Sequence, residues 1–172
     1  MADEKRVRDL MIPVEEYMTV DADGLVKEAV AVLSRGLEKP GCQRSVIVIG
    51  PNGAPVGLLT IRRLLKAVEP QLVDLPHSIS WIIEDTASKL FPEGLFAERS
   101  KKQGEKKVRE VMDSLNLITV EAEAPLLKAV HLMMRHNVGA LPVLDAGRLV
   151  GMIRMEDIFH EIAGLFTAED GG

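Results

Sequence analysis

Two similar stretches decide the fold: Val-Gly-Leu-Leu at Val56–Leu59 and Val-Gly-Met-Ile at Val150–Ile153. Each stretch comes at the end of the same series of apolar runs and turns. Upstream of them lie two further runs rich in apolar residues, Ser45–Ile49 and Ala140–Leu144. Gly-Pro-Asn-Gly separates the first pair of runs and Asp-Ala-Gly the second pair, and these residues are typical of tight turns. The sequence therefore predicts two β-hairpins of one design, with strands at Ser45–Ile49 and Pro55–Thr60 in the first.

An amphipathic helix is predicted before each hairpin and another after it. In each helix apolar residues recur at positions i, i+3, i+4 and i+7, which places them on one face. The helices before the hairpins carry Val26, Ala29, Val30 and Leu33, and then, one hundred positions later, Leu126, Ala129, Val130 and Met133. The helices after the hairpins carry Ile61, Leu64, Leu65 and Val68, and then Met155, Ile158, Phe159 and Ile162. Pro125 suits the first position of its helix, where a missing N–H group has no consequence.

The segments before these helices repeat as well. Val-Arg-Asp-Leu-Met at Val7–Met11 returns as Val-Arg-Glu-Val-Met at Val108–Met112, and a short Thr-Val strand at Thr19-Val20 returns at Thr119-Val120. The order β-α-β-β-α thus occurs twice, which predicts an α+β fold built from two copies of one unit. We expect the first repeat at residues 7–69, a helical insertion and linker at 70–107, and the second repeat at 108–166.

The insertion has no counterpart in the repeat. Apolar residues spaced along it predict an amphipathic helix around Trp81, the single tryptophan of the chain. Two interpretations stay open for this helix: it packs on the edge of the repeats, or it forms a surface for docking a partner across Ser78–Phe96.

Composition excludes several classes of function. A net charge of −5 and an aromatic content of 3% disfavour a nucleic-acid binder. The single cysteine, Cys42, rules out an intrachain disulfide and favours a reducing environment. The charged start of the chain lacks the features of a signal peptide, and no apolar run approaches the length of a membrane span. We therefore expect a cytoplasmic protein that does not enter a membrane.

Catalytic chemistry is not predicted. His131 and His136 are five residues apart and do not share a helix face, so a metal site is not expected. Cys42 has no base near it in the sequence, and no phosphate-binding loop or nucleophile elbow occurs. The methionines, including Met133, Met134, Met152 and Met155, fall on apolar stripes and are expected to fill the core.

The whole arrangement resembles a tandem pair of CBS (cystathionine β-synthase type) domains, also called a Bateman module. The repeated Val-Arg-(Asp/Glu)-x-Met segment, the Thr-Val strands, His136–Val143 and Leu149–Ile153 carry the resemblance. It implies two repeats packed sheet to sheet, with clefts that bind adenine nucleotides such as AMP, ADP or ATP, and less often S-adenosylmethionine or NAD. It also implies a homodimer, parallel or antiparallel, that needs no cofactor and regulates a protein partner without catalysing a reaction.

The nucleotide motif of that family has Ser or Thr after the third strand and Asp three residues later. A hydroxyl beside the N–H groups of a starting helix suits phosphate, and an ionised carboxylate accepts hydrogen bonds from ribose hydroxyls. Each copy here has kept one of the two residues. The first copy has Thr60 and then Arg63 in place of the acid, whereas the second has Arg154 in place of the hydroxyl and then Asp157.

The resemblance therefore favours the second copy, with Asp157 on the ribose and Arg154 towards phosphate. The pattern also assigns to this site Ile118, Thr119, Val138, Gly139, Ala140 and Pro142, of which Ile118, Val138 and Pro142 would flank the adenine and the backbone of Thr119 and Ala140 would read its edge. The matching positions in the first copy are Met18, Thr19, Arg44, Ser45, Val46, Thr60 and Arg63, with Arg44 as a phosphate ligand.

Two functional interpretations follow. In the first, the chain is a regulatory module that senses an adenine nucleotide. In the second, it is a ligand-free dimerisation or docking module that acts through the insertion, since an acid in the first turn of a helix is favourable without any ligand, and arginines often form surface ion pairs.

Overall fold

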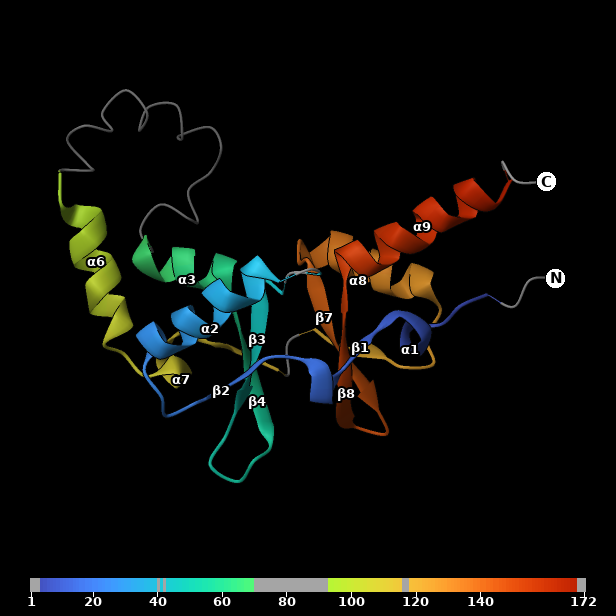
Figure 1. Ribbon diagram of the computed structural model, residues 1–172. Coiled ribbons are helices and arrows are strands. Elements are labelled where there is room, and N and C mark those ends of the chain that lie inside the picture. The colour runs from blue at the N-terminus through green and yellow to red at the C-terminus, as the bar shows by residue number, and fades with distance from the viewer. Residues whose placement is uncertain (1–3, 40, 42, 70–92, 116–117, 170–172) are drawn as a thin grey trace. The chain divides into compact units, whose positions relative to one another are not determined.

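The computed structural model describes residues 4–39, 41, 43–69, 93–115 and 118–169, and Figure 1 shows its elements. Cys42, Trp81 and most of the Ser78–Phe96 segment lie outside these residues. The elements are α1 (Val7–Leu10), β1 (Ile12–Pro13), the 3-10 turn η1 (Val14–Glu16), β2 (Thr19–Asp21), α2 (Val26–Glu38), β3 (Ser45–Ile49), β4 (Pro55–Thr60), α3 (Ile61–Val68), α6 (Leu95–Gly104), α7 (Val108–Val111), β5 (Asp113–Ser114), β6 (Val120–Glu121), α8 (Leu126–His136), β7 (Ala140–Asp145), β8 (Arg148–Arg154) and α9 (Met155–Glu169). None of the helices within these residues is long and apolar enough to cross a membrane.

The α+β class and the two hairpins are confirmed. β3 pairs antiparallel with β4, and β7 pairs antiparallel with β8 through a turn at Ala146-Gly147 where both residues have positive φ. β2 and β6 each add a parallel strand to their hairpin, so that the Thr-Val segments lie beside β3 and β7. With one further short strand, each sheet reaches four strands, in the orders β2-β3-β4-β5 and β1-β8-β7-β6.

The helices before the hairpins bury most of the face that their apolar spacing predicts, but Val30 of α2, expected on that face, is 43% exposed. α2 buries Val26, Ala29 and Leu33 against β3 and β4, and α8 buries Ala129 and Met133 against β7 and β8. Pro125 lies one position earlier than predicted. It caps α8 with an extended ψ of 149°, and the helix begins at Leu126. A proline at this position still leaves no N–H group without a partner.

The compact units differ from the repeats as read along the sequence. One unit, called unit 1, comprises Met1–Tyr17 and Leu115–Gly172, and unit 2 comprises Met18–Ser114. The segment that opens each repeat therefore belongs to the unit formed by the other repeat. β1 pairs with β8 in unit 1, and β5 pairs with β4 in unit 2.

Equivalent backbone hydrogen bonds hold the two exchanged segments. The N–H groups of Val7 and Arg8 donate to Ala124 and Ala122 over 3.0 and 2.9 Å. In unit 2 the N–H groups of Val108 and Arg109 donate to Gly24 and Ala22 over 2.9 and 3.0 Å. Each arginine also pairs with an acid at the start of the helix that it meets, Arg8 with Glu123 and Arg109 with Asp23. The repeated Val-Arg pair is thus the attachment point of an exchanged segment.

Two glycines allow the exchanged strands to approach. A Cβ atom on Gly151 would lie 2.5 Å from the carbonyl oxygen of Ile12 and 2.8 Å from the Met11 sulfur. A Cβ atom on Gly57 would lie 2.5 Å from the carbonyl oxygen of Asp113 and 2.6 Å from the Met112 sulfur. Real Cβ atoms do not sit so close to backbone oxygens, so only glycine fits beside β1 and β5. The repeated glycine and the repeated methionine are the two sides of one contact.

The prediction that the methionines fill the core is wrong for two of them. Met133 and Met152 are buried, but Met134 and Met155 are exposed on α8 and α9. Phe159 and Ile162 on α9, and Leu65 on α3, are exposed as well. Helical spacing shows that residues share a face, but it does not show how much of an apolar face the sheet behind it can cover. In α8 and α9 the apolar surface extends beyond the part that meets the sheet.

We predict that Gly151→Ala lowers the free energy of unfolding by about 1–3 kcal/mol, the usual effect of forcing a methyl group into a packed contact. The methyl group would displace β1 from β8, since its obstacle is the backbone of Ile12. Urea denaturation followed by circular dichroism measures the loss. Gly164→Ala is the matched control, because nothing lies within 4 Å of that position in α9 and alanine favours a helix by about 0.5–1 kcal/mol. Equal effects of the two substitutions would contradict the contact.

Candidate functional site

An Arg–Asp pair occupies the start of α9. The carboxylate of Asp157 accepts hydrogen bonds from the Arg154 backbone N–H at 3.0 Å, from its Nε at 2.9 Å and from its Nη2 at 2.7 Å. Only 11% of the Arg154 side chain and 14% of the Asp157 side chain are exposed. The two residues that the sequence assigned to phosphate and ribose are therefore bound to each other.

The pair favours the charged form of Arg154. The hydrogen bond to Asp157 raises the pKa of the Arg154 guanidinium above its ordinary value, and this effect exceeds the lowering caused by burial. An arginine is already protonated at neutral pH, so the raised pKa keeps the positive charge fixed across the neutral range. Arg154 is thus a permanent cation at the N-terminus of a helix, a place that otherwise attracts anions.

The equivalent position in unit 2 is arranged differently. The hydroxyl of Thr60 accepts the backbone N–H of Arg63 over 3.0 Å and caps α3. The Arg63 side chain donates from Nε to the Val111 carbonyl at 2.7 Å, and its Nε lies 3.3 Å from Asp113. Arg63 therefore holds the exchanged segment α7–β5, and its side chain is engaged with the chain itself.

The two copies have kept opposite halves of a capping box. In a complete box, the Ser or Thr at the N-cap accepts the N–H of the third helical residue, and the acid at that residue accepts the N–H of the N-cap. Thr60 makes the first of these bonds and Asp157 the second. The divergence seen in the sequence therefore leaves each helix capped, which gives both residues a structural role besides any ligand contact.

The other predicted residues of the second copy gather around the start of α9. The Gly139 carbonyl accepts the N–H of Met155 at 2.8 Å, and Ala140 pairs with Arg154 across β7 and β8. Val120 lies opposite Val143 in a parallel pair, so the residues just before β6, which include Ile118 and Thr119, lie beside the start of β7. Val138 and Ile118 are partly buried against the core, and Pro142 is buried.

The predicted residues of the first copy gather in the same way in unit 2. Met18 accepts the N–H of Ile47 through its carbonyl at 2.9 Å, and Thr19 lies opposite Ile47. The Arg44 carbonyl accepts the N–H of Ile61 at 3.2 Å, and Ser45 pairs with Thr60. Ser45 and Val46 are buried, whereas Arg44 is exposed. Their assignment to a ligand stays a prediction in both copies.

Sequence reasoning missed Tyr17, the only tyrosine of the chain. It is buried in unit 1, and its Coulomb interaction is among the effects that raise the pKa of Arg154, so the phenol lies near the guanidinium. The position one hundred residues later is Leu117, so the repeat gives no sign of a polar group here. Tyr17 reaches the site because η1, which it follows directly, packs against β8.

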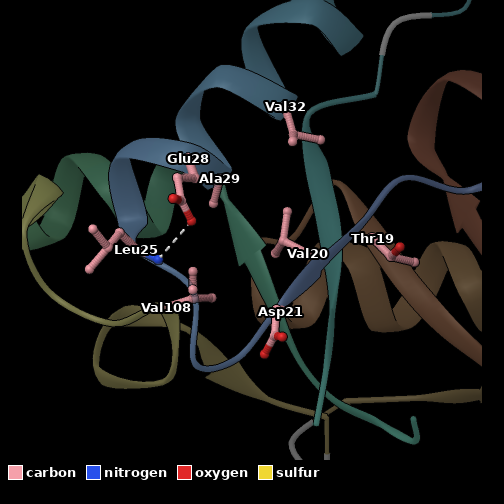
Figure 2. Close-up of a pocket in the computed structure, with 9 residues that line it drawn as sticks. Thr19, Val20, Asp21, Leu25, Glu28, Ala29, Val32 and Val108 are labelled. Carbon is pink, nitrogen blue, oxygen red and sulfur yellow. Dashed lines mark hydrogen bonds between the residues drawn. The ribbon is translucent and has the colours of Figure 1, made fainter. Parts of the chain in front are cut away.

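A shallow pocket of about 200 Å³ lies elsewhere, beside β2 and the start of α2 (Figure 2). Thr19 is the one predicted site residue among those that line it, and the rest include Asp21, Leu25 and Glu28. Its carboxylates are already bound, since Glu28 accepts the N–H of Leu25 at 3.2 Å and Asp21 accepts the N–H of Asp23 at 2.9 Å. The pocket does not coincide with the Arg154–Asp157 pair.

A metal centre finds no support in the part of the chain that the structure describes. Within it, no three His, Cys, Asp or Glu side chains come together in a way that could hold an ion.

The family model for the CBS domain matches residues 7–70 and 108–164, and the chain belongs to the CBS domain family. A CBS domain-containing protein from Dictyostelium discoideum is 36% identical over 93 residues, which are 51% of this chain and 63% of that protein. The matched part therefore spans less than two thirds of that relative.

Solved structures share the fold at low sequence identity. A CBS-domain containing protein from Agrobacterium tumefaciens has a TM-score of 0.64 at 20% identity, covering 93% of this chain and 95% of that one. CBSX2, solved in complex with AMP, has a TM-score of 0.63 at 21% identity and covers 92% and 97%. A CBS domain-containing protein from Bacillus anthracis has a TM-score of 0.63 at 20% identity and covers 93% and 94%.

We predict that Thr60→Ala lowers the free energy of unfolding by about 1 kcal/mol, the usual effect of losing an N-cap acceptor. Thr60→Ser is the control and should retain most of the stability, because serine also accepts the N–H of Arg63. Chemical denaturation of the three proteins measures the difference. Equal losses from alanine and serine would show that the Thr60 methyl group matters and the cap does not.

Proposed function

We propose that this chain is a regulatory module that binds an adenine nucleotide at the start of α9 and catalyses no reaction itself. Membership of the CBS domain family and the AMP complex of the similar CBSX2 support a nucleotide ligand. The observation that carries the proposal is the Arg154–Asp157 pair, which sets a fixed cation and a carboxylate side by side at a helix N-terminus. No cofactor is required, and AMP, ADP or ATP is the expected ligand.

The pair makes ribose binding more favourable when a phosphate group is present. Both oxygens of Asp157 accept hydrogen bonds from Arg154, so a ribose diol competes with the guanidinium for the same carboxylate. A phosphate group removes this competition, because it gives the guanidinium another bidentate anionic partner. Asp157 then keeps the Arg154 backbone N–H and has lone pairs available for ribose hydroxyls.

If phosphate replaces Asp157 as the partner of the Arg154 guanidinium, the adenine compounds should differ in affinity. Nucleotides should bind more tightly than adenosine, and S-adenosylmethionine, which has no phosphate, should bind weakly. NAD keeps a diphosphate and stays possible as a ligand. In a regulatory role, the nucleotide would favour whichever conformation binds it better and so change the affinity for a protein partner.

A thermal-shift series tests for any ligand. At one hundred times its Kd, a ligand that binds only the folded state stabilises it by about 2.7 kcal/mol. We expect a rise in Tm with AMP, ADP or ATP and a smaller rise with adenosine at the same concentration. If no adenine compound moves the Tm at millimolar concentration, nucleotide sensing is refuted. A ligand-free docking module that uses the Ser78–Phe96 insertion then takes its place, consistent with the internal engagement of Arg63 and Arg154.

Arg154→Gln tests the phosphate exchange by calorimetry. A charged hydrogen bond contributes about 1.5–3 kcal/mol, so we expect the wild type to bind AMP at least about tenfold more tightly than adenosine. Arg154→Gln should bring this ratio close to one, because it weakens AMP and frees Asp157 for adenosine. Arg148→Gln, at the other end of β8, is the control and should keep the wild-type ratio.

Asp157→Asn tests the ribose contact. Wild-type protein should prefer AMP over 2′-deoxy-AMP, and Asp157→Asn should lose this preference while still binding the phosphate. The amide can still accept the Arg154 backbone N–H, so the variant keeps its helix cap. Retention of the preference would place the ribose on another residue.

A further inference from the structure

A methionine sulfur lies in each of the two contacts that hold the exchanged segments. The sulfur and Cγ of Met11 lie 2.8 and 3.1 Å from the place that a Cβ atom on Gly151 would occupy. In unit 2 the sulfur and Cγ of Met112 lie 2.6 and 3.3 Å from the same place beside Gly57. The two thioethers therefore fill the space of the side chains that these glycines lack. Each contact depends on an apolar, unbranched and flexible group.

The surroundings of both sulfurs suit a thioether and disfavour a polar group. Met11 packs against the buried cluster of unit 1, and Met112 packs against that of unit 2. A backbone carbonyl oxygen, of Ile12 or of Asp113, lies 2.5 Å from the same Cβ place as each sulfur. An oxygen atom on the sulfur would bring a second partial negative charge there, in a contact that offers it no hydrogen bond. Because water hydrates this oxygen once the segment is detached, oxidation favours detachment.

Both side chains are partly open to solvent, which gives a small oxidant such as hydrogen peroxide access to them. Met11 and Met112 are partly exposed, whereas Met133 and Met152 are buried. Peroxide transfers one oxygen atom to a thioether: its O–O bond breaks, an S–O bond forms, sulfur loses two electrons, and the other oxygen leaves as water. The modification is reversible, because methionine sulfoxide reductases return the sulfoxide to the thioether.

Three further described methionines are open to solvent, but they do not hold an exchanged segment. Met134 and Met155 are exposed on α8 and α9. Met18 is partly exposed, and its sulfur lies beside Gly36 of α2, inside unit 2. Oxidation of these three side chains therefore does not act directly on β1 or β5.

We propose that Met11 and Met112 are sites of reversible oxidation by peroxide, and that their sulfoxides loosen the exchanged segments α1–β1 and α7–β5 from the sheets that hold them. The chain thus carries two equivalent redox-sensitive attachments, one in each unit. Their response is independent of nucleotide binding, because it acts through β1 and β5 and not through the start of α9.

Hydrogen exchange of the full chain before and after peroxide treatment tests each segment separately. The N–H groups of Val7 and Arg8 report on α1–β1, because they donate to the unit that holds this segment. Those of Val108 and Arg109 report on α7–β5 in the same way. We expect all four protons to exchange at least about tenfold faster after oxidation, since local opening sets their exchange rate. Treatment with the two methionine sulfoxide reductases, one for each sulfoxide epimer, should restore slow exchange.

Single substitutions assign each effect to one sulfur. Leucine is apolar, similar in volume to methionine and inert to peroxide. After peroxide treatment, Met11→Leu should keep exchange slow at α1–β1 only, and Met112→Leu should keep it slow at α7–β5 only. Met134→Leu/Met155→Leu is the matched control, because it removes two exposed methionines that hold neither segment. This variant should respond to peroxide as the wild type does.

Met11→Gln/Met112→Gln needs no oxidant, because its amides bring polar oxygen atoms to the two contacts, and it should exchange fast at both segments. Peptide mass spectrometry measures the oxygen added at each methionine. Oxidation of Met11 and Met112 no faster than that of the buried Met133 and Met152 would overturn the proposal. So would slow exchange in protein that carries both sulfoxides, or a wild-type response in Met11→Leu/Met112→Leu. A null result in the nucleotide titrations leaves these outcomes unaffected, so the two proposals fail separately.

Discussion

The close approach of β1 to Gly151 and of β5 to Gly57 is the constraint on which the rest of the structure depends. It fixes a glycine in the second strand of each hairpin and a methionine beside it in the opening segment of the other repeat. It also determines where Val7 and Val108 form their backbone hydrogen bonds. These residues begin the short helices α1 and α7, which lead directly into β1 and β5. The duplicated motifs are therefore two sides of one contact surface.

At the start of α9 the same carboxylate serves as a helix cap and as the partner of an arginine. Asp157 satisfies the backbone N–H of Arg154 and binds its guanidinium, so the carboxylate is needed for the helix before any ligand arrives. In unit 2, Thr60 provides the cap and leaves Arg63 to hold Val111. Loss of one half of the box is tolerated in each copy because the other half remains. The starts of α3 and α9 therefore carry different side-chain contacts although the two folds match.

Much of the fold could be predicted from the sequence. The bounds of β3 and β4 follow from two apolar runs and a turn whose glycine at position 53 has a positive φ. The exchange could not be predicted, because Val7–Met11 and Val108–Met112 are so alike that neither shows which sheet it joins. Periodicity likewise groups Met133 with Met134 as apolar without showing that one faces the sheet and the other solvent.

The candidate site was predictable only in part. The resemblance to the CBS family pointed to Arg154 and Asp157, but not to their binding each other, since that depends on side-chain rotamers at a helix start. Tyr17 could not be found, because it reaches Arg154 from a distant part of the chain and has a leucine as its repeat counterpart. Local motifs thus indicate which groups are present, whereas the exchanged segments decide which groups meet.

The exchange of opening segments also bears on how the chain unfolds. A single repeat on its own would carry an opening strand with no sheet to join, and its sheet would lack the strand that pairs with the hairpin. The unpaired strand edge could then form hydrogen bonds with another chain. Two such single-repeat chains would complete each other by swapping, which is the arrangement that the duplicated chain makes within itself. Having both repeats on one chain makes this association intramolecular, so that it does not depend on protein concentration. It also ties the melting of the two halves together, because neither can unfold without taking an edge strand from the other.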